Sequence, residues 1–183
     1  EPSTRTNFSF QTAMLRLGGS VFGFADPNSS SVSKGETLKD TIKIVSNYAD
    51  VIVMRTPWEG AIKPDSLYAN VPVVNAGDGG HIHPTQTMAD LTTITRLRGK
   101  VDDLAIGLCG DLKNGRTVHS LSMAMRHFTP TFHFIAPEEL KMPEEYKIYC
   151  REHDIRFVEH TDFTEEIIAD ADILYMTRVQ RER

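Results

Sequence analysis

The chain is poor in cysteine and lacks a long apolar run. Its 183 residues include two cysteines, Cys109 and Cys150, which cannot build a disulfide framework. Cys109 sits in an apolar segment, which predicts a buried thiol and a reducing, cytoplasmic location. The sequence shows no signal peptide and no uninterrupted apolar stretch long enough to cross a bilayer, so we expect no association with membranes.

The chain also lacks an excess of positive charge. It has 20 Lys and Arg against 25 Asp and Glu, a formal net charge of -5, and this balance does not favour binding to nucleic acid or anionic membranes. A site for anions must therefore be built locally from a few Arg and Lys side chains. The composition, 40% hydrophobic and 25% charged, is typical of a globular protein.

Apolar strands and amphipathic helices alternate along the chain. The strands are apolar throughout, without the alternation of a half-exposed sheet, which predicts parallel sheets covered on both faces. We expect an α/β fold of two doubly wound parallel-sheet domains, residues 1–98 and 99–183. The expected strands are 21–24, 51–54, 71–74, 104–109, 132–136, 155–158 and 173–176; the expected helices are 7–17, 37–48, 84–98, 117–127, 143–153 and 163–169.

Polar clusters follow several of these strands, at Arg55, 75–86, 110–116 and 177–180. In open α/β sheets, ligands bind beyond the carboxyl ends of the strands. The clusters therefore predict a ligand site to which both halves of the chain contribute.

Ser3-Thr4-Arg5-Thr6 opens a predicted helix. One hydroxyl would suffice as a helix cap, which is the simpler interpretation. Three hydroxyls and a guanidinium at a helix N-terminus, where backbone N–H groups are free, also form a strong receptor for an oxyanion such as phosphate.

Arg55, His83 and Gln86 are further candidates. Arg55 follows four apolar residues and must reach solvent, pair with Glu59 or meet an anion. His83 and Gln86 lie one turn apart at a helix start, where they are either polar end residues or ligands for an uncharged group such as a carbamoyl. His81 and His83 have metal-like spacing, but the absence of nearby Cys or carboxylate partners argues against zinc.

Residues 110–117 imitate a nucleotide-binding P-loop, with a strand, a loop and a helix around Gly110 and Gly115. Arg116 replaces the lysine that such a loop needs, and Asp111 would place a carboxylate in the phosphate cradle. Arg116 is better interpreted as a fork for a carboxylate or phosphate. Lys34, in the polar loop 25–36, is by its surroundings alone a solvated lysine.

Together these strings resemble the transcarbamoylase family. Ser3-Thr4-Arg5-Thr6 followed by Ser9-Phe10 is similar to the carbamoyl-phosphate signature of that family. Ornithine transcarbamoylases share this signature and the His-Pro-x-Gln string but differ around Lys34, 110–120 and Arg178. The strings that resemble aspartate transcarbamoylases in particular are Lys34-Gly35-Glu36-Thr37, Asn75-Ala76-Gly77-Asp78-Gly79, His83-Pro84-Thr85-Gln86, Gly110-Asp111-Leu112-Lys113, Gly115-Arg116-Thr117-Val118-His119-Ser120 and Tyr175-Met176-Thr177-Arg178-Val179-Gln180.

The resemblance implies transfer of the carbamoyl group from carbamoyl phosphate to L-aspartate in de novo pyrimidine biosynthesis. It implies that the first domain binds carbamoyl phosphate and the second binds aspartate, with no metal and no organic cofactor. Catalysis would fall to Thr6, Arg55 and His83. The implied carbamoyl-phosphate ligands are Ser3, Thr4, Arg5, Thr6, Ser30, Lys34, Arg55, His83 and Gln86, and the implied aspartate ligands are Lys34, Arg116, Arg178 and Gln180.

The resemblance also implies a homotrimer with shared active sites, in which Ser30 and Lys34 reach the neighbouring subunit's site. It leaves open regulatory chains or fused pyrimidine-pathway enzymes. The family chain extends beyond both ends of this sequence, so we expect the 183 residues alone to be inactive. The competing interpretations are a non-catalytic homologue, which should have lost site residues, a transcarbamoylase for another amino acid, and a P-loop nucleotide-binding protein.

Overall fold

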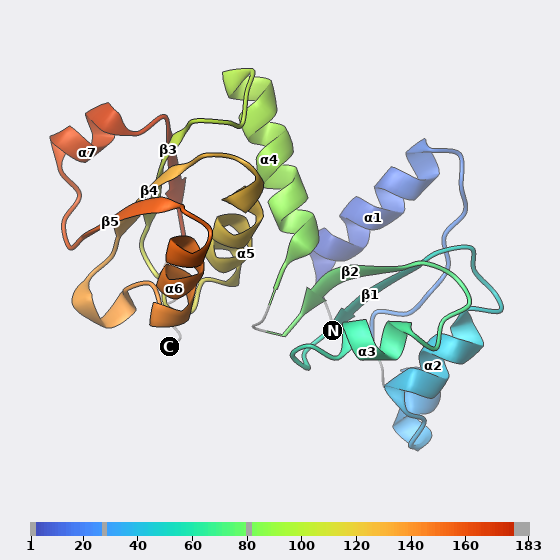
Figure 1. Cartoon of the computed structure of the whole chain (residues 1–183). Helices are drawn as coiled ribbons and strands as arrows, with labels where there is room; N and C mark the ends of the chain where they lie inside the picture. The colour runs from blue at the N-terminus through green and yellow to red at the C-terminus, as the bar shows by residue number, and fades with distance from the viewer. Residues whose placement is uncertain (1–2, 27–28, 80–81, 178–183) are drawn as a thin grey trace. The chain divides into compact units, whose positions relative to one another are not determined.

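The computed structural model describes residues 3–26, 29–79 and 82–177 of the chain. The chain forms two compact units, Glu1–His81 and Ile82–Arg183 (Figure 1). Each unit contains parallel strands, which confirms the predicted α/β class. The boundary between residues 98 and 99 was predicted from two expected binding roles, which a division into compact units does not test, so it stays a prediction.

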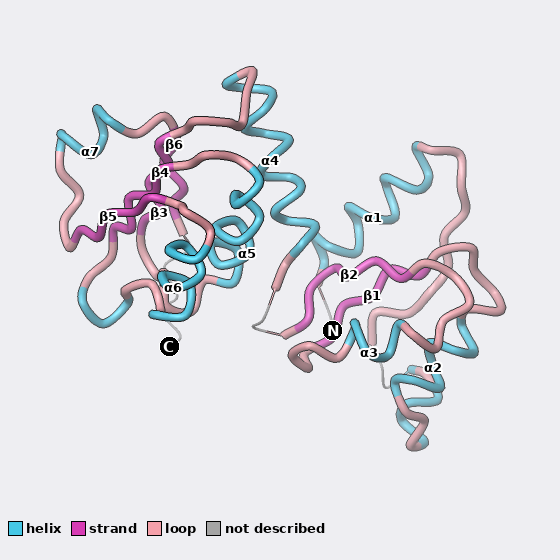
Figure 2. Tube along the Cα trace, in the orientation of Figure 1, coloured by secondary structure: helices cyan, strands magenta, loops and turns pink. Residues whose placement is uncertain are grey.

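The first unit is built on a two-stranded parallel sheet (Figure 2). Most of its predicted elements are present with shifted ends. The predicted strand 21–24 is wrong: these residues form an irregular segment in which Val21, Phe22 and Phe24 are exposed. The elements of the unit are α1 (Thr4–Arg16), η2 (Ser31–Lys34), α2 (Leu38–Val45), β1 (Ile52–Thr56), α3 (Ile62–Ser66) and β2 (Val73–Asp78).

Local sequence signals explain where the helices of this unit begin. The hydroxyl of Thr37 accepts a hydrogen bond from the backbone N–H of Asp40 and caps α2, which buries Thr41 and Ile42. Helix α3 was not predicted, and it contains Pro64, a residue that disfavours the interior of a helix. The helix is short enough for Pro64 to occupy its first turn.

The second unit is built on a four-stranded parallel sheet in the order β5-β4-β3-β6. The chain moves from β3 through β4 to β5 and then returns to the other side of β3. Right-handed crossovers place α7 on the face opposite α5 and α6, as Figure 1 shows. The elements are α4 (Pro84–Arg98), β3 (Ala105–Cys109), α5 (Arg116–Ala124), η3 (Met125–His127), β4 (Thr131–Ile135), η4 (Glu138–Leu140), α6 (Glu144–Glu152), β5 (Arg156–His160), α7 (Glu165–Asp170) and β6 (Ile173–Met176).

The core of the second unit lies around its two central strands. Ile106 and Leu108 of β3 and Phe132 and Phe134 of β4 are each at most 2% exposed. Buried residues of α5 and α6, among them Val118, Leu121 and Cys150, pack on one face of the central strands and complete the core. This packing fixes the carboxyl ends of β3 and β6, where the polar clusters were predicted.

The cysteines differ from expectation. Both are free thiols, but Cys109 is only partly buried, so the prediction of a buried Cys109 is wrong. It lies at the last position of β3, where the strand leaves the core. The buried thiol is Cys150 on α6, and burial raises its pKa to about 11.

Within the described residues, no helix is both long and apolar enough to cross a membrane.

His119 of α5 holds the loop that contains Leu112 against this core. Its Nε2 lies 2.7 Å from the carbonyl oxygen of Leu112, and its ring stacks on Tyr146 at 4.0 Å between centroids. Burial lowers the pKa of His119 below its ordinary value of 6.5, against opposing effects of the Leu112 carbonyl, Glu145 and Asp111. The neutral imidazole therefore suits the folded state.

Truncation in the core should be costly. Leu108→Ala removes a fully buried side chain and should lower the free energy of unfolding by about 2–5 kcal/mol. Leu174→Ala on the neighbouring strand β6 is the control, since Leu174 is 38% exposed and should cost less. Denaturant unfolding measures both; equal losses would contradict the proposed position of the core.

His119 should make stability depend on pH. Because its folded-state pKa lies below 6.5, the unfolded chain binds more protons, and the free energy of unfolding should fall as pH drops below about 6.5. His119→Gln should flatten this slope, whereas His127→Gln, at an exposed position, should not. Thermal unfolding between pH 7.5 and 5.5 measures the slopes; an unchanged slope in His119→Gln would rule out burial of a neutral imidazole.

Candidate functional site

The N-terminus of α1 gathers the first cluster of predicted site residues. Ser3 is the N-cap and has an extended backbone, and its hydroxyl donates to the Thr6 hydroxyl at 3.0 Å instead of capping the helix. Thr4 and Arg5 are exposed. The first turn of α1 contains no acidic residue. The hydroxyls and the helix N–H groups are thus arranged to receive an anion.

Arg55 lies against this cluster within the first unit. Its Nη1 donates to the Thr6 hydroxyl at 3.4 Å, so the same oxygen accepts from Ser3 and from Arg55. The guanidinium and the helix start therefore face a common point. Ser3, Thr6 and Arg55, predicted as ligands of one phosphate, are brought together.

An irregularity in the sheet positions Arg55. Met54 pairs with Asn75 and Thr56 pairs with Asp78, so the single residue Arg55 lies opposite two residues of β2. Such a bulge redirects the side chain beside it. Gly77, one of the two opposing residues, has φ of +124°, and a Cβ there would lie 3.3 Å from Nη1 of Arg55. Glycine allows both this backbone conformation and the close approach of the guanidinium.

Ser120 joins two predicted site residues in the second unit. Its hydroxyl accepts from the backbone N–H of His83 at 2.9 Å and donates to the carbonyl of Arg116 at 2.8 Å. His83 is the N-cap of α4, with Pro84 at the first position, and Arg116 begins α5. One buried hydroxyl therefore fixes the starts of both helices. Ser120 was not predicted as a site residue, since a serine within a helix gives no such signal.

Gln86 is held by a residue that sequence reasoning missed. The Nε2 of Gln86 donates to Oδ1 of Asp90 at 2.9 Å, and the Tyr175 hydroxyl donates to Oδ2 of Asp90 at 3.3 Å. The spacing of four residues on α4 was the available signal, because it places Gln86 and Asp90 on one helix face. The carboxylate thereby connects α4 to β6.

The loop between β3 and α5 differs from a P-loop. The carboxylate of Asp111 accepts from the backbone and side-chain N–H groups of Asn114, at 2.9 Å for the backbone bond. The loop thus binds its own carboxylate where a P-loop would cradle a phosphate, which supports the rejection of the nucleotide-binding interpretation. Leu112 anchors the loop, since its side chain is fully buried.

The same loop contacts the residue after β6. The backbone N–H of Asp111 donates to the Thr177 hydroxyl at 2.7 Å, and the N–H of Thr177 donates to the Cys109 carbonyl at 2.8 Å. A Cβ on Gly110 would overlap the Thr177 hydroxyl, so this contact requires glycine. The carboxyl ends of β3 and β6 meet at the point where strand order reverses, the usual place for a ligand. Arg178 and Gln180, predicted to bind aspartate, lie outside the described residues.

Ser30 and Lys34 belong to η2, which packs against α2. Ser30 is its N-cap and accepts from the N–H of Val32 at 3.3 Å. Lys34 is exposed in its last turn, before Gly35, which has φ of +95°. Exposure suits the predicted reach of Lys34 toward another subunit and equally suits a solvated lysine.

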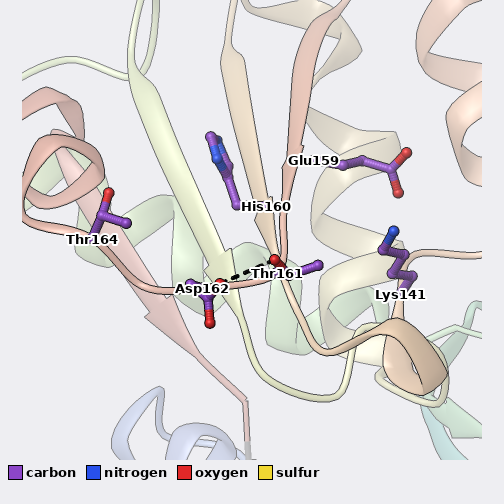
Figure 3. Close-up of a pocket in the computed structure, with 6 residues that line it drawn as sticks. All are labelled: Lys141, Glu159, His160, Thr161, Asp162 and Thr164. Carbon is purple, nitrogen blue, oxygen red and sulfur yellow. Dashed lines mark hydrogen bonds between the residues drawn. The ribbon is translucent and has the colours of Figure 1, made fainter.

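A cavity of about 330 Å³ lies beyond the carboxyl end of the edge strand β5 (Figure 3). Two of its lining charges form ion pairs, Lys141 at 2.7 Å from Glu138 and Glu159 at 3.2 Å from Lys147, and the Asp162 carboxylate accepts from the Thr161 hydroxyl at 3.2 Å. Among the residues that the structure describes, none of the predicted site residues lines it. The lining residues are Lys141, Glu159, His160, Thr161, Asp162 and Thr164.

Curated relatives resemble the whole chain. It is 70% identical to the aspartate carbamoyltransferase catalytic subunit of Bacteroides fragilis and 69% identical to that of Bacteroides thetaiotaomicron, in each case over all 183 residues. It covers 59% and 58% of these relatives. The chain therefore spans about three fifths of the length of the relatives that it matches.

Solved structures also resemble the whole chain. The catalytic subunit of the M. jannaschii aspartate transcarbamoylase is 49% identical with a TM-score of 0.93, and the match covers 100% of this chain and 60% of that one. The Trypanosoma cruzi aspartate transcarbamoylase, in complex with carbamoyl aspartate and phosphate, is 41% identical with a TM-score of 0.89, at 100% and 60% coverage. These matches confirm the predicted transcarbamoylase fold.

A family model identifies the first half of the chain. Residues 1–96 match the aspartate/ornithine carbamoyltransferase carbamoyl-P binding domain. This range contains the α1 cluster, Arg55, His83 and Gln86, whose geometry is described above. The chain belongs to the aspartate/ornithine carbamoyltransferase family.

Proposed function

We propose that a full-length chain carrying these residues transfers the carbamoyl group of carbamoyl phosphate to the amine of L-aspartate in de novo pyrimidine biosynthesis. The products are N-carbamoyl-L-aspartate and phosphate. The observation that carries the proposal is the convergence of Ser3, Thr6 and Arg55 at the start of a helix whose first turn has no carboxylate. The names of the similar curated proteins support the choice of aspartate over ornithine.

The two substrates are assigned to different parts of the chain. Residues 1–98 bind carbamoyl phosphate, in keeping with the family model over residues 1–96, and residues 99–183 bind aspartate. Two free thiols are in keeping with a cytoplasmic enzyme.

The phosphate of carbamoyl phosphate binds at the α1 N-terminus. Free N–H groups of the first helical turn and the hydroxyls are suitable donors, and Arg5 and Arg55 supply the positive charge. Ser30 and Lys34 of a neighbouring subunit complete the phosphate site in this proposal. The proposed phosphate ligands are Ser3, Thr4, Arg5, Thr6, Ser30, Lys34 and Arg55.

The carbamoyl oxygen accepts from Thr6, Arg55 and His83, while Gln86 contacts the carbamoyl amino group. The aspartate amine attacks the carbamoyl carbon, and negative charge grows on the carbamoyl oxygen. Each donor placed on that oxygen stabilises the transition state by about 3 kcal/mol. The departing phosphate accepts the proton of the amine, so no covalent nucleophile, metal or organic cofactor is required.

Aspartate brings two carboxylates, for which planar guanidinium groups are well suited. Arg116, Arg178 and Gln180 hold them, with Lys34. The hydrogen bond from the Ser120 hydroxyl to the Arg116 carbonyl supports precise placement of Arg116, and the hydrogen bond between Asp111 and Thr177 holds the end of β6 against the same loop.

We further propose a homotrimer whose active sites each take Ser30 and Lys34 from a neighbour. An exposed lysine at the end of a short 3-10 helix, supported by α2, can extend to a second chain. Regulatory chains or fused pathway enzymes are compatible with this arrangement.

Arg55→Ala should lower turnover of the full-length enzyme by about two to three orders of magnitude, because one transition-state donor is lost. Arg16→Ala, which removes an exposed arginine of the same unit, should leave turnover unchanged. Steady-state formation of carbamoyl aspartate measures both. Near-normal turnover in Arg55→Ala would refute the assignment of Arg55.

The shared site can be tested by complementation. Lys34→Ala and His83→Ala should each inactivate the enzyme, and a mixture of the two should regain partial activity, because some sites of hybrid trimers contain both residues. Each variant dissociated and reassociated alone is the control. Absence of activity after demonstrated subunit exchange would exclude a role of Lys34 in the neighbour's site.

A further inference from the structure

Asp90 is a charged residue of α4 to which no role is assigned in the proposed site. It lies one helical turn after Gln86 and is partly buried. Its Oδ1 accepts from the Gln86 Nε2 at 2.9 Å, and its Oδ2 accepts from the Tyr175 hydroxyl at 3.3 Å. Both carboxylate oxygens are therefore engaged, by groups from two different elements.

The chemistry of this contact fixes the orientation of the Gln86 amide. An ionised carboxylate can only accept hydrogen bonds, so the NH2 end of Gln86 must face Asp90. The carbonyl oxygen of the amide then points away from Asp90. Without the carboxylate, the two ends of the amide would be free to exchange by rotation about the last side-chain bond.

The orientation matters because the carbamoyl amino group is a hydrogen-bond donor. The Gln86 carbonyl oxygen can accept a hydrogen bond from this amino group, whereas the Gln86 NH2 group is itself a donor and cannot. We propose that Asp90 is a positioning residue, which holds the Gln86 amide so that its carbonyl oxygen accepts from the amino group of carbamoyl phosphate. The proposal rests on the proposed function, since it depends on Gln86 contacting that substrate.

Tyr175 makes Asp90 a rigid partner. Its hydroxyl, carried by the strand β6, donates to Oδ2 of Asp90. Asp90 is thereby connected to β6, the strand that precedes the proposed aspartate ligand Arg178. Burial raises the pKa of Asp90, and the hydrogen bonds from Gln86 and Tyr175 oppose this by stabilising the charged form.

Comparing the binding of two ligands distinguishes this positioning role from a general structural role. Carbamoyl phosphate and acetyl phosphate have similar shape and charge, but acetyl phosphate has a methyl group in place of the amino group. Asp90→Ala in the full-length enzyme should weaken carbamoyl phosphate binding about tenfold, the effect of one mispaired hydrogen bond, and should leave acetyl phosphate binding unchanged. Calorimetric titration or inhibition constants measure both affinities.

Three further variants make the test specific. Asp90→Asn should restore most of the affinity for carbamoyl phosphate, because its oxygen can face Gln86 while its NH2 group faces the Tyr175 hydroxyl. Thr93→Ala, at an exposed position of the same helix, should change neither affinity. If Asp90 acts through Gln86, adding Asp90→Ala to a Gln86→Ala variant should cause no further loss of affinity for carbamoyl phosphate.

The outcomes are separable. If Asp90→Ala weakens the binding of carbamoyl phosphate and acetyl phosphate equally, the positioning role is overturned while the proposed function stays intact. The same holds if the losses of affinity in the double variant are additive. Should Asp90→Ala fail to fold, Tyr175→Phe should shift the same affinity ratio by a smaller factor, and an unchanged ratio would overturn the role. A wild-type chain that forms no carbamoyl aspartate would overturn the proposed function and this inference with it.

Discussion

The attraction between a few fixed cations and the two proposed anionic substrates is the interaction on which the arrangement of the site depends. The chain carries a net charge of -5, so its overall field repels such substrates. Local geometry must overcome this repulsion. In the first unit, Arg55 and the N-terminus of α1 share the Thr6 hydroxyl as a common neighbour, in a turn without carboxylates. The helix N–H groups add positive potential without adding a mobile side chain.

Backbone irregularities and buried hydroxyls position these groups. A bulge opposite Arg55 and the positive φ of Gly77 direct the guanidinium, and Ser120 fixes the starts of α4 and α5. Asp90 is proposed to do the same for the Gln86 amide. Each of these features sets the orientation of a site group rather than its charge. Stabilisation of a transition state by fixed donors requires such orientation. The regular helices and strands keep the backbone rigid, and the irregular positions and polar contacts orient individual side chains.

The sequence predicted much of this arrangement. Unbroken apolar strands predicted the parallel sheets, and helix α4 was predicted with its observed bounds from Pro84 and Gly99. Ser3, Thr6 and Arg55 were selected because of their places at a helix start and a strand end. The bulge beside Arg55 was not predictable, since it depends on the register between two strands. The roles of Ser120 and Asp90 depend on contacts between elements, which spacing along one helix does not reveal.

Two errors have related causes. Val21, Phe22 and Phe24 have strand-forming side chains, but strands require a paired neighbour, and these residues are exposed in an irregular segment. Cys109 follows an apolar run, but it lies where β3 leaves the core and is only partly buried. In both cases the local composition was apolar, and the tertiary environment decided the outcome.

The most direct test of the account is a substrate comparison with the purified full-length chain. Carbamoyl phosphate would be supplied with either L-aspartate or L-ornithine, and carbamoylated product and phosphate would be quantified. The account predicts equal amounts of carbamoyl aspartate and phosphate with aspartate, and no carbamoylated product with ornithine. Preferential carbamoylation of ornithine, or no transfer to aspartate by a folded chain, would contradict it.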